Sequence, residues 1–459
     1  MRNEHDSFAI LDQALAAAGT AEADAVFIST DQNISRFANS NVHQNMSEIS
    51  AELSLRVIVD NAMGVASTTV FDGDEIARTA ALAREAAHHA DPLPNFSGLY
   101  RANEPLPSVR TFDDATANIA PAEKARDLRT MFDRGVASGV HFAGVYGTGA
   151  LSVAVANTHG VRRYCTMTAS DATVIAIGAN GSGYATAVDR SNVDVTALGE
   201  EAAFKAALRA DVIEDIAPGP YDVILEPPAT AEVLEWMTMI AFSGSAYEDG
   251  SSFFVGNIGN QVLGANFTLT DDALDDAFLP FPFDIEGLPK RRVAIIERGI
   301  VRTPVVDKAY ADRLGFAPTA NGWSLGGSDH GSALHLSIEG GDATREELIR
   351  STKRGIWVTR FNYVNGLLEP RTALMTGTTR DGTFLIRDGE IVARLPNLRW
   401  TQSIVEAFSR IEGLTRERRR VGTWYNHFGG TIAPVMKIAG WNFTGKQQTG
   451  GMAQSSLGD

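Results

Sequence analysis

The feature that most constrains the fold is a pair of long strand-like segments joined by a short turn. Residues 140–157 and 161–177 flank residues 157–160 (NTHG), whose composition is typical of a turn. Strands joined so closely pair antiparallel, because parallel strands need a crossover of about a dozen residues or more. Residues 47–60, whose apolar residues alternate, and residues 65–70 predict a second hairpin. Antiparallel hairpins are therefore expected in the first half of the chain.

Helices are expected between these hairpins. One is predicted over residues 8–18, and Asp72 is a suitable N-cap for a second. Pro121 stands where proline is tolerated best, at the first position of a third helix. Residues 193–210 predict a fourth. The Gly-rich residues 178–183 follow a hairpin and not a strand that leads into a helix, so they do not form a dinucleotide-binding fingerprint.

A change of composition divides the chain. Residues 211–221 contain an acidic run followed by Pro-Gly-Pro, and strand-like segments dominate beyond them. We therefore predict an α+β protein. Its N-terminal α/β domain with antiparallel hairpins comprises residues 1–215, and its β-rich C-terminal domain comprises residues 216–459.

The second half opens with a strand at residues 221–225 and a helix at residues 230–242 whose apolar residues recur at helical spacing. A Ser/Gly-rich loop is expected after this helix. Farther along, residues 381–382 (DG) predict a turn between two strands, and residues 400–411 predict an amphipathic helix. The Gly/Ser-rich residues 321–331 are expected to be exposed.

The charge balance limits the partners of the chain. Its 459 residues carry a formal charge of −16, and its isoelectric point is near 5.1. Such a chain repels phosphate backbones, so no nucleic acid is expected as a partner. The basic residues 416–420 (RERRR) are interpreted as a solvated helix end or the rim of an interface.

Cysteine and hydropathy indicate the compartment. Cys165 is the only cysteine, so no intrachain disulfide is possible, which suits a reducing cytosol. The first residues carry charges of both signs and do not resemble a signal peptide. No run of about 20 apolar residues occurs, so no membrane span is expected. The protein is predicted to be cytoplasmic.

Few histidines are candidates for catalysis or metal binding. The chain has no HExxH and no phosphate-binding GKS or GKT sequence. His330 and His335, beside Asp329, form a conceivable metal site, but a third ligand and a general base on a fixed scaffold are lacking. His427 lies among aromatic and glycine residues and is interpreted either as a cleft residue or as a packed, hydrogen-bonded histidine.

Four acidic residues follow the helix at residues 230–242. Glu248, Asp249, Asp284 and Glu286 carry carboxylates that are able to serve in acid–base chemistry. Nothing in the sequence brings them together, so they are expected to be solvated loop acids.

Several stretches together resemble the TldD/PmbA family, on its PmbA (TldE) side, whose members are also described as modulators of DNA gyrase. The resemblance extends from about residue 39 to about residue 408. It rests on the order and spacing of the stretches NSNVHQNMSEISAELSLRVIVDNAMGVAST, AYEDGSSFFVGNIGNQVLG, FDIEGLPKRRVAIIERGIVRTPVVDKAYADRLGF, GDATREELIRSTKRGIWVTRFNYVN and ALMTGTTRDGTFLIRDGEIVARLPNLRWTQSIVEAF.

The resemblance implies a two-subunit metallopeptidase whose metal site lies on the TldD-type subunit. That subunit binds its metal through HExxxH on a helix and a cysteine of the C-terminal domain. The equivalent positions here are near Trp236, Met237 and Ala241, and Cys165 lies in the other half of the chain. We therefore expect no catalytic residue, no metal and no cofactor in this chain.

The same resemblance implies a peptide-binding role beside a metal-bearing TldD-type partner. Residues 247–254 are predicted as a chamber wall, with residues 284–287 and 360–365 as weaker candidates. The residues predicted to contact peptide are Tyr247, Ser251, Phe253, Phe254 and His427.

Two alternatives stay open at this point. The chain is either a hydrolase by itself, through His330, His335 or His427, or a binding protein without catalysis that pairs with a second copy of itself. The sequence does not identify the peptide substrate or the cleavage preference.

Overall fold

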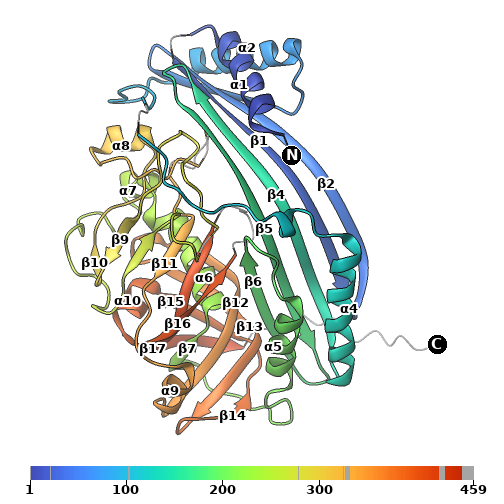
Figure 1. Cartoon of the computed structure of the whole chain (residues 1–459). Helices are drawn as coiled ribbons and strands as arrows, with labels where there is room; N and C mark the ends of the chain where they lie inside the picture. The colour runs from blue at the N-terminus through green and yellow to red at the C-terminus, as the bar shows by residue number, and fades with distance from the viewer. Residues whose placement is uncertain are drawn as a thin grey trace.

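The computed structural model describes residues 2–20, 22–101, 104–277, 279–323, 325, 331–422 and 429–446. Their strands form two sheets that pack together (Figure 1). This arrangement confirms the predicted α+β class. We call the residues up to 215 the N-terminal unit and the later residues the C-terminal unit. A domain boundary at residue 215 stays a prediction, although each sheet takes its strands from one unit.

The N-terminal unit is built on a six-stranded antiparallel sheet in the order β3-β2-β1-β4-β5-β6. The predicted long hairpin is confirmed, since β4 and β5 pair from Ala156 with Arg162 to His141 with Ile177. The Gly-rich segment turns β5 into one further strand, β6. The strands are β1 (Glu22–Ala38), β2 (Asn41–Val59), β3 (Ala62–Thr68), β4 (His141–Asn157), β5 (Arg162–Ile177) and β6 (Ser182–Asp189).

Helices cover one face of this sheet at its two ends (Figure 1). Apolar residues of α1 and α2 pack on β1, β2 and β4 at one end, and those of α4 and α5 pack on β4, β5 and β6 at the other. The predicted starts are confirmed, because the Asp72 carboxylate caps α2 and Pro121 opens α4. The helices are α1 (Glu4–Ala18), α2 (Gly73–His89), α3 (Asp114–Ala117), α4 (Pro121–Ala137) and α5 (Val195–Ala207).

The C-terminal unit is built on an eleven-stranded sheet. Strand β7 pairs with both β12 and β17, so that β17, β15, β13, β12 and β7 close into a ring. The strands are β7 (Gly219–Leu225), β8 (Leu269–Asp271), β9 (Val293–Glu297), β10 (Ile300–Val301), β11 (His335–Ile338), β12 (Arg354–Glu369), β13 (Leu374–Arg387), β14 (Glu390–Arg394), β15 (Leu398–Ser403), β16 (Ile411–Val421) and β17 (Gly430–Lys446).

Short helices connect these strands, and none of the helices in the described ranges is long and apolar enough to span a membrane. The predicted helix at residues 230–242 is present, but its last turn, Thr238–Phe242, is a π turn. The loop expected after it contains α7, which Ser243 caps. The helices are α6 (Pro227–Met237), α7 (Gly244–Glu248), α8 (Lys308–Leu314), α9 (Arg345–Arg350) and α10 (Ile404–Ser409), with a 3₁₀ turn at Pro370–Thr372.

Three predictions for this unit were wrong. Residues 381–382 do not end a strand: β13 continues through them, with both residues at positive φ where its register with β12 shifts. Residues 400–411 divide into β15, α10 and the start of β16, because the Trp400 ring is buried against Phe361 and Trp441. Residues 321–331 were expected to be exposed, but Asn321 and Gly322 are buried, while residues 324 and 326–330 lie outside the described residues.

The second face of the N-terminal sheet packs against the C-terminal unit. Val26, Val153 and Cys165 lie in one apolar cluster with Leu279 and Phe283. Burial raises the pKa of the Cys165 thiol to about 11. One face of the sheet therefore carries helices, while the other is shared with the second half of the chain.

Ion pairs continue this contact along β16. Residues 416–420, interpreted as a helix end or the rim of an interface, are part of this strand. Arg419 pairs with Glu201 at 2.8 Å, and Arg420 bonds to Asp189, so both guanidinium groups reach carboxylates of the N-terminal unit. Arginine residues of this basic segment thus form ion pairs within the molecule.

Candidate functional site

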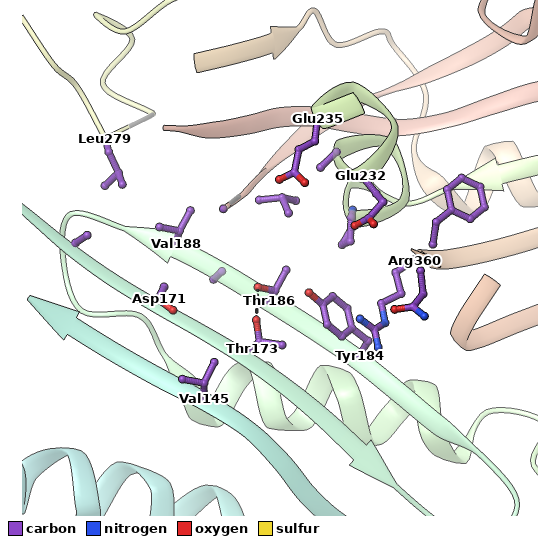
Figure 2. A pocket seen from close by; sticks show the side chains of 18 residues that line it. Val145, Asp171, Thr173, Tyr184, Thr186, Val188, Glu232, Glu235, Leu279 and Arg360 are labelled. Atoms are coloured by element: carbon purple, nitrogen blue, oxygen red, sulfur yellow. Dashed lines mark hydrogen bonds between the residues drawn. The ribbon is translucent and has the colours of Figure 1, made fainter. Parts of the chain in front are cut away.

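A cavity of about 510 Å³ lies between the two units (Figure 2). Strands β5 and β6 of the N-terminal sheet line one side, and helix α6 lines the other. Residues of β12 and the end of β16 complete the wall. The volume lies in the range of pockets that bind small molecules.

Helix α6 presents one polar face to this cavity. Pro228, Ala231, Glu232 and Glu235 line it at a spacing of three and four residues, which places them on one side of a helix. The Glu232 and Glu235 side chains point from the helix toward the sheet (Figure 2). The opposite face, including Met237, is fully buried in the apolar core. The same periodicity that anchors α6 therefore directs two carboxylates into the cavity.

The strands contribute a third carboxylate and several hydroxyl groups. Asp171 and Thr173 lie on β5, and Thr186 lies opposite Thr173 on β6, with their hydroxyl oxygens 3.1 Å apart. A Cβ atom at Gly147 would lie 2.3 Å from the Asp171 Oδ1 atom. Because Gly147 has no side chain, the Asp171 carboxylate is able to lie across β4.

Burial affects the charged groups around the cavity. It raises the pKa of the Glu232 carboxyl, and the positive charge of Arg360 opposes this shift. On the other face of the sheet, burial lowers the pKa of Lys124 to about 8, and the charge of Asp171 opposes that shift. The carboxylates thus stand in a poorly solvated environment in which a cation interacts strongly with them.

Arg360 is the one cation among the described lining residues. Its Nε atom donates a hydrogen bond of 2.9 Å to Asp381, and its guanidinium lies 4.3 Å from the centre of the Tyr184 ring. Asp381 also accepts a hydrogen bond of 2.7 Å from Ser182 Oγ at the start of β6. Arg360 therefore links β12 and β13 to β6, and Asp381 largely neutralises its positive charge.

Apolar side chains occupy the three positions considered for a metal-binding sequence, two at the end of α6 and one in the π turn that follows it. Met237 and Ala241 are fully buried. Trp236 is half-buried and packs on β12, because a Cβ atom at Gly366 would lie 2.9 Å from its ring. No group of three or more His, Cys, Asp or Glu residues is arranged to hold a metal ion within the described ranges.

The histidines of the sequence analysis are not brought together. His335 is fully buried in β11, where its backbone N–H donates to Asp271 at 3.0 Å and its Nε2 atom lies 3.3 Å from the Leu279 carbonyl oxygen. It is a packed residue of the strand. His330 and His427, as well as Asp329, lie outside the described residues.

The predicted peptide contacts at residues 247–254 lie together but away from the cavity. Phe253 and Phe254 belong to the apolar core, with their ring centres 4.9 Å apart. Tyr247 is half-buried and meets the Phe316 ring edge-on at 5.3 Å. The Ser251 hydroxyl donates to the Ala246 carbonyl oxygen at 3.1 Å. Phe253 and Phe254 have almost no exposed surface with which to contact a peptide. Contact of Tyr247 and Ser251 with peptide stays a prediction.

The expectation that Asp284 and Glu286 are solvated loop acids was wrong. Both are buried against the N-terminal sheet, where Arg56 on β2 bonds to Glu286 at 3.0 Å and to Asp24. Burial raises the pKa of Asp284 to about 6 and that of Glu286 to about 8. Arg56 was the missed signal, since it is a charged residue within the apolar stretch LSLRVIV.

Solved structures of other proteins share the fold of this chain. The structure of TldE from Thermococcus kodakarensis matches with a TM-score of 0.84 at 19% identity, over 96% of this chain and 99% of that one. A Thermotoga maritima structure, described as a proposed modulator of a DNA gyrase, matches with a TM-score of 0.82 at 18% identity, over 94% and 99% of the two chains. The chain therefore has a TldE-like fold.

Family models confirm the resemblance found in the sequence. PmbA/TldA metallopeptidase domain 1 matches residues 23–87, and the PmbA/TldA metallopeptidase C-terminal domain matches residues 218–445. The chain belongs to the TldD/PmbA family.

Two curated relatives match over part of their length. A metalloprotease of Methanothermobacter thermautotrophicus is 22% identical over 218 residues, or 47% of each chain. A metalloprotease TldD homologue of Haemophilus influenzae is 26% identical over 170 residues, or 35% of this chain and 33% of that one. The matched part thus spans about half the length of these relatives or less.

Proposed function

We propose that this chain is a PmbA/TldE-type subunit that holds peptide for a metal-bearing TldD-type partner and does not itself supply the metal. The observation that carries the proposal is the composition of helix α6. The helix and the π turn that follows it have Trp236, Met237 and Ala241 at the expected metal-binding positions, and the helix directs Glu232 and Glu235 into the cavity.

The chemistry of these side chains supports cleavage by another chain. A catalytic zinc site in a peptidase takes imidazole and carboxylate ligands and leaves one position open for water. Indole, thioether and methyl groups do not replace such ligands, and Met237 and Ala241 are packed in the core. In this proposal a partner subunit supplies the zinc-activated water.

The position of the cavity supports a peptide-holding role. Strand β6 lies at the end of the N-terminal sheet and also lines the cavity. An extended peptide adds to a sheet edge through backbone hydrogen bonds, which tolerate many side chains. In this proposal Tyr247, Ser251 and residues 360–365 are further contacts for peptide or partner.

A reconstitution experiment tests the proposal. The chain, a TldD-type chain with HExxxH and their mixture are each tested for mass of the intact complex, zinc content and hydrolysis of casein and short peptides. We expect a stoichiometric complex, with hydrolysis only when the TldD-type chain is present.

Two results would support the other readings. Hydrolysis by this chain alone, with a stoichiometric metal and loss of activity in His330→Ala, would identify an autonomous hydrolase. Absence of both complex and hydrolysis, together with a dimeric mass of the chain alone, would identify a homodimeric binding protein.

A further inference from the structure

One carboxyl group of the cavity has no bonding partner within the described ranges. Asp171 and Glu235 also line the cavity, but both interact with other groups of the protein. Glu232 points from α6 toward the sheet (Figure 2) and takes part in no hydrogen bond or ion pair there. Its pKa is raised by burial, and the charge of Arg360 opposes this shift. The oxygens of Glu232 are therefore available to a hydrogen-bond donor that enters the cavity.

A second polar group of the wall lacks a partner as well. Asn362 lines the cavity, and its Nδ2 atom is buried without a hydrogen-bond acceptor among the described residues. Buried donors without an acceptor are costly and uncommon in proteins. A ligand oxygen in the cavity supplies the missing acceptor once the Asn362 side chain turns toward it.

The backbone at Asn362 has an unusual conformation. The register of β12 with β13 shifts directly after Asn362, and Tyr363 has a φ of 53°, which an aromatic residue rarely adopts. The Asn362 carbonyl oxygen accepts a hydrogen bond of 3.0 Å from the Thr378 hydroxyl. Such irregularities redirect side chains and are common beside functional sites. The strand is thus shaped at the residue that carries the unpaired amide.

Packing of α6 along β12 brings the two groups to the same stretch of the wall. The helix begins where the Glu226 N–H donates to the Val358 carbonyl oxygen at 3.0 Å. Ten residues later the Trp236 ring lies against Gly366. The helix and the strand therefore run in the same direction. Glu232 lies between these two contacts on the helix, as Asn362 does on the strand.

Together the two side chains match an uncharged amide. A carboxylate oxygen accepts from an amide N–H, and the Asn362 amide group donates to an amide carbonyl oxygen. An acidic ligand offers no donor to an ionised Glu232, and Asp381 already neutralises the charge of Arg360. An alkyl side chain offers neither a donor nor an acceptor.

We propose that Glu232 and Asn362 form a subsite for an amide group of a bound peptide, with Glu232 accepting from its N–H and Asn362 donating to its carbonyl oxygen. The inference rests on the proposed peptide-holding function and adds the kind of group that the cavity selects. The amide belongs either to a glutamine or asparagine side chain or to the peptide backbone, and the experiment separates these sources.

Calorimetric titration of the full chain with short peptides tests the subsite. Three acetylated and amidated five-residue alanine peptides are compared, with glutamine, methionine or glutamate at the central position. We expect the glutamine peptide to bind about tenfold more tightly than the methionine peptide, whose side chain has a similar length but no amide. The glutamate peptide should bind no better than the methionine peptide.

Variants connect this preference to the two residues. The double variant Glu232→Leu with Asn362→Leu is expected to reduce the ratio to about one. Glu232→Gln keeps an acceptor oxygen without the charge and should keep most of the ratio. Glu85→Leu, at an exposed position of α2, is the matched control and should keep all of it.

Thermal unfolding provides a readout that a purely structural role would not give. The leucine variants remove polar groups that have no partner, so they should unfold at the same temperature as the original protein or a higher one. A clear decrease would show that these groups are bonded in the free protein and would overturn the argument.

The outcomes separate this inference from the proposed function. Equal binding of the glutamine and methionine peptides, weakened alike in the double variant, would identify the backbone as the source of the amide. A preference that the double variant keeps, a preference lost in Glu232→Gln, or equal binding that the double variant does not change would overturn the amide subsite and leave the peptide-holding role in place. Absence of binding by every peptide would overturn both.

Discussion

Removal of the Arg56 guanidinium is expected to destabilise the protein strongly. Its Nε atom lies 2.8 Å from Asp24 Oδ1, and its Nη2 atom lies 3.0 Å from Glu286 Oε1. The three side chains are between 2% and 4% exposed, so solvent screens their charges little. The Arg56→Met variant keeps much of the apolar stem but leaves two buried carboxylates without their cation.

The magnitude follows from the cost of an uncompensated buried charge. Removal of one partner from a buried ion pair costs about 3–5 kcal/mol. That is a large part of the 5–15 kcal/mol that is typical for the unfolding free energy of a protein. In a urea titration monitored by tryptophan fluorescence, the midpoint should fall by roughly 1 M.

Two further variants make the test specific. Arg78→Met removes an exposed guanidinium paired with Glu75 on α2, and we expect a change of less than about 0.5 kcal/mol. Adding Asp24→Asn to Arg56→Met should restore part of the lost stability, because one buried charge fewer remains. The reasoning would be refuted if Arg56→Met unfolded within about 0.5 kcal/mol of the original protein, as expected for the surface control.

Three other predictions concern single residues. The pKa of Glu286 is raised to about 8 in the folded protein from an ordinary 4.5, so stability should fall as the pH rises between these values, and Glu286→Gln should flatten this fall in urea titrations at several pH values. Gly149→Ala should destabilise by about 1–3 kcal/mol, and more than Gly147→Ala in thermal unfolding, because its Cβ meets backbone and not the end of the Asp171 side chain. The buried Cys165, with a pKa near 11, should not react with a thiol reagent at pH 8 until denaturant is added, and rapid reaction of the native protein would contradict its placement.

Local signals in the sequence predicted much of the fold. The Asp72 carboxylate accepts a hydrogen bond from a backbone N–H group in the first turn of α2, which has no acceptor within the helix. Pro121 has no backbone N–H group, so no unpaired donor arises at the first position of α4. Gly19 ends α1 at positive φ, and Thr344 with Glu347 forms a capping box for α9. Each of these depends on neighbours within a few residues.

The failures depend on contacts between distant residues. The segment that begins at Trp400 is a strand because its ring packs between Phe361 and Trp441, which no local period reveals. The Asp381-Gly382 pair has the composition of a turn, yet Arg360 and Ser182 bond to the Asp381 carboxylate within a continuous strand. Tertiary packing decided both cases against local preference.

The cavity was equally hidden in the sequence. Asp171 and Glu232 are far apart in the chain, and only the packing of α6 against the N-terminal sheet brings them to one space. One signal was present, since Glu232 and Glu235 fall on the same side of an otherwise apolar helix. Two acidic residues three positions apart on a buried helix therefore indicate that this side of the helix faces a polar space.

The ion pairs of β16 also determine how salt acts on the molecule. Arg419 is 53% exposed and its partner Glu201 is 21% exposed, whereas Arg420 is 13% exposed and its partner Asp189 is 43% exposed, so one member of each pair is open to dissolved ions. We therefore expect added salt to weaken both ion pairs, while the apolar contacts of Val26, Val153 and Cys165 continue to hold the two units together.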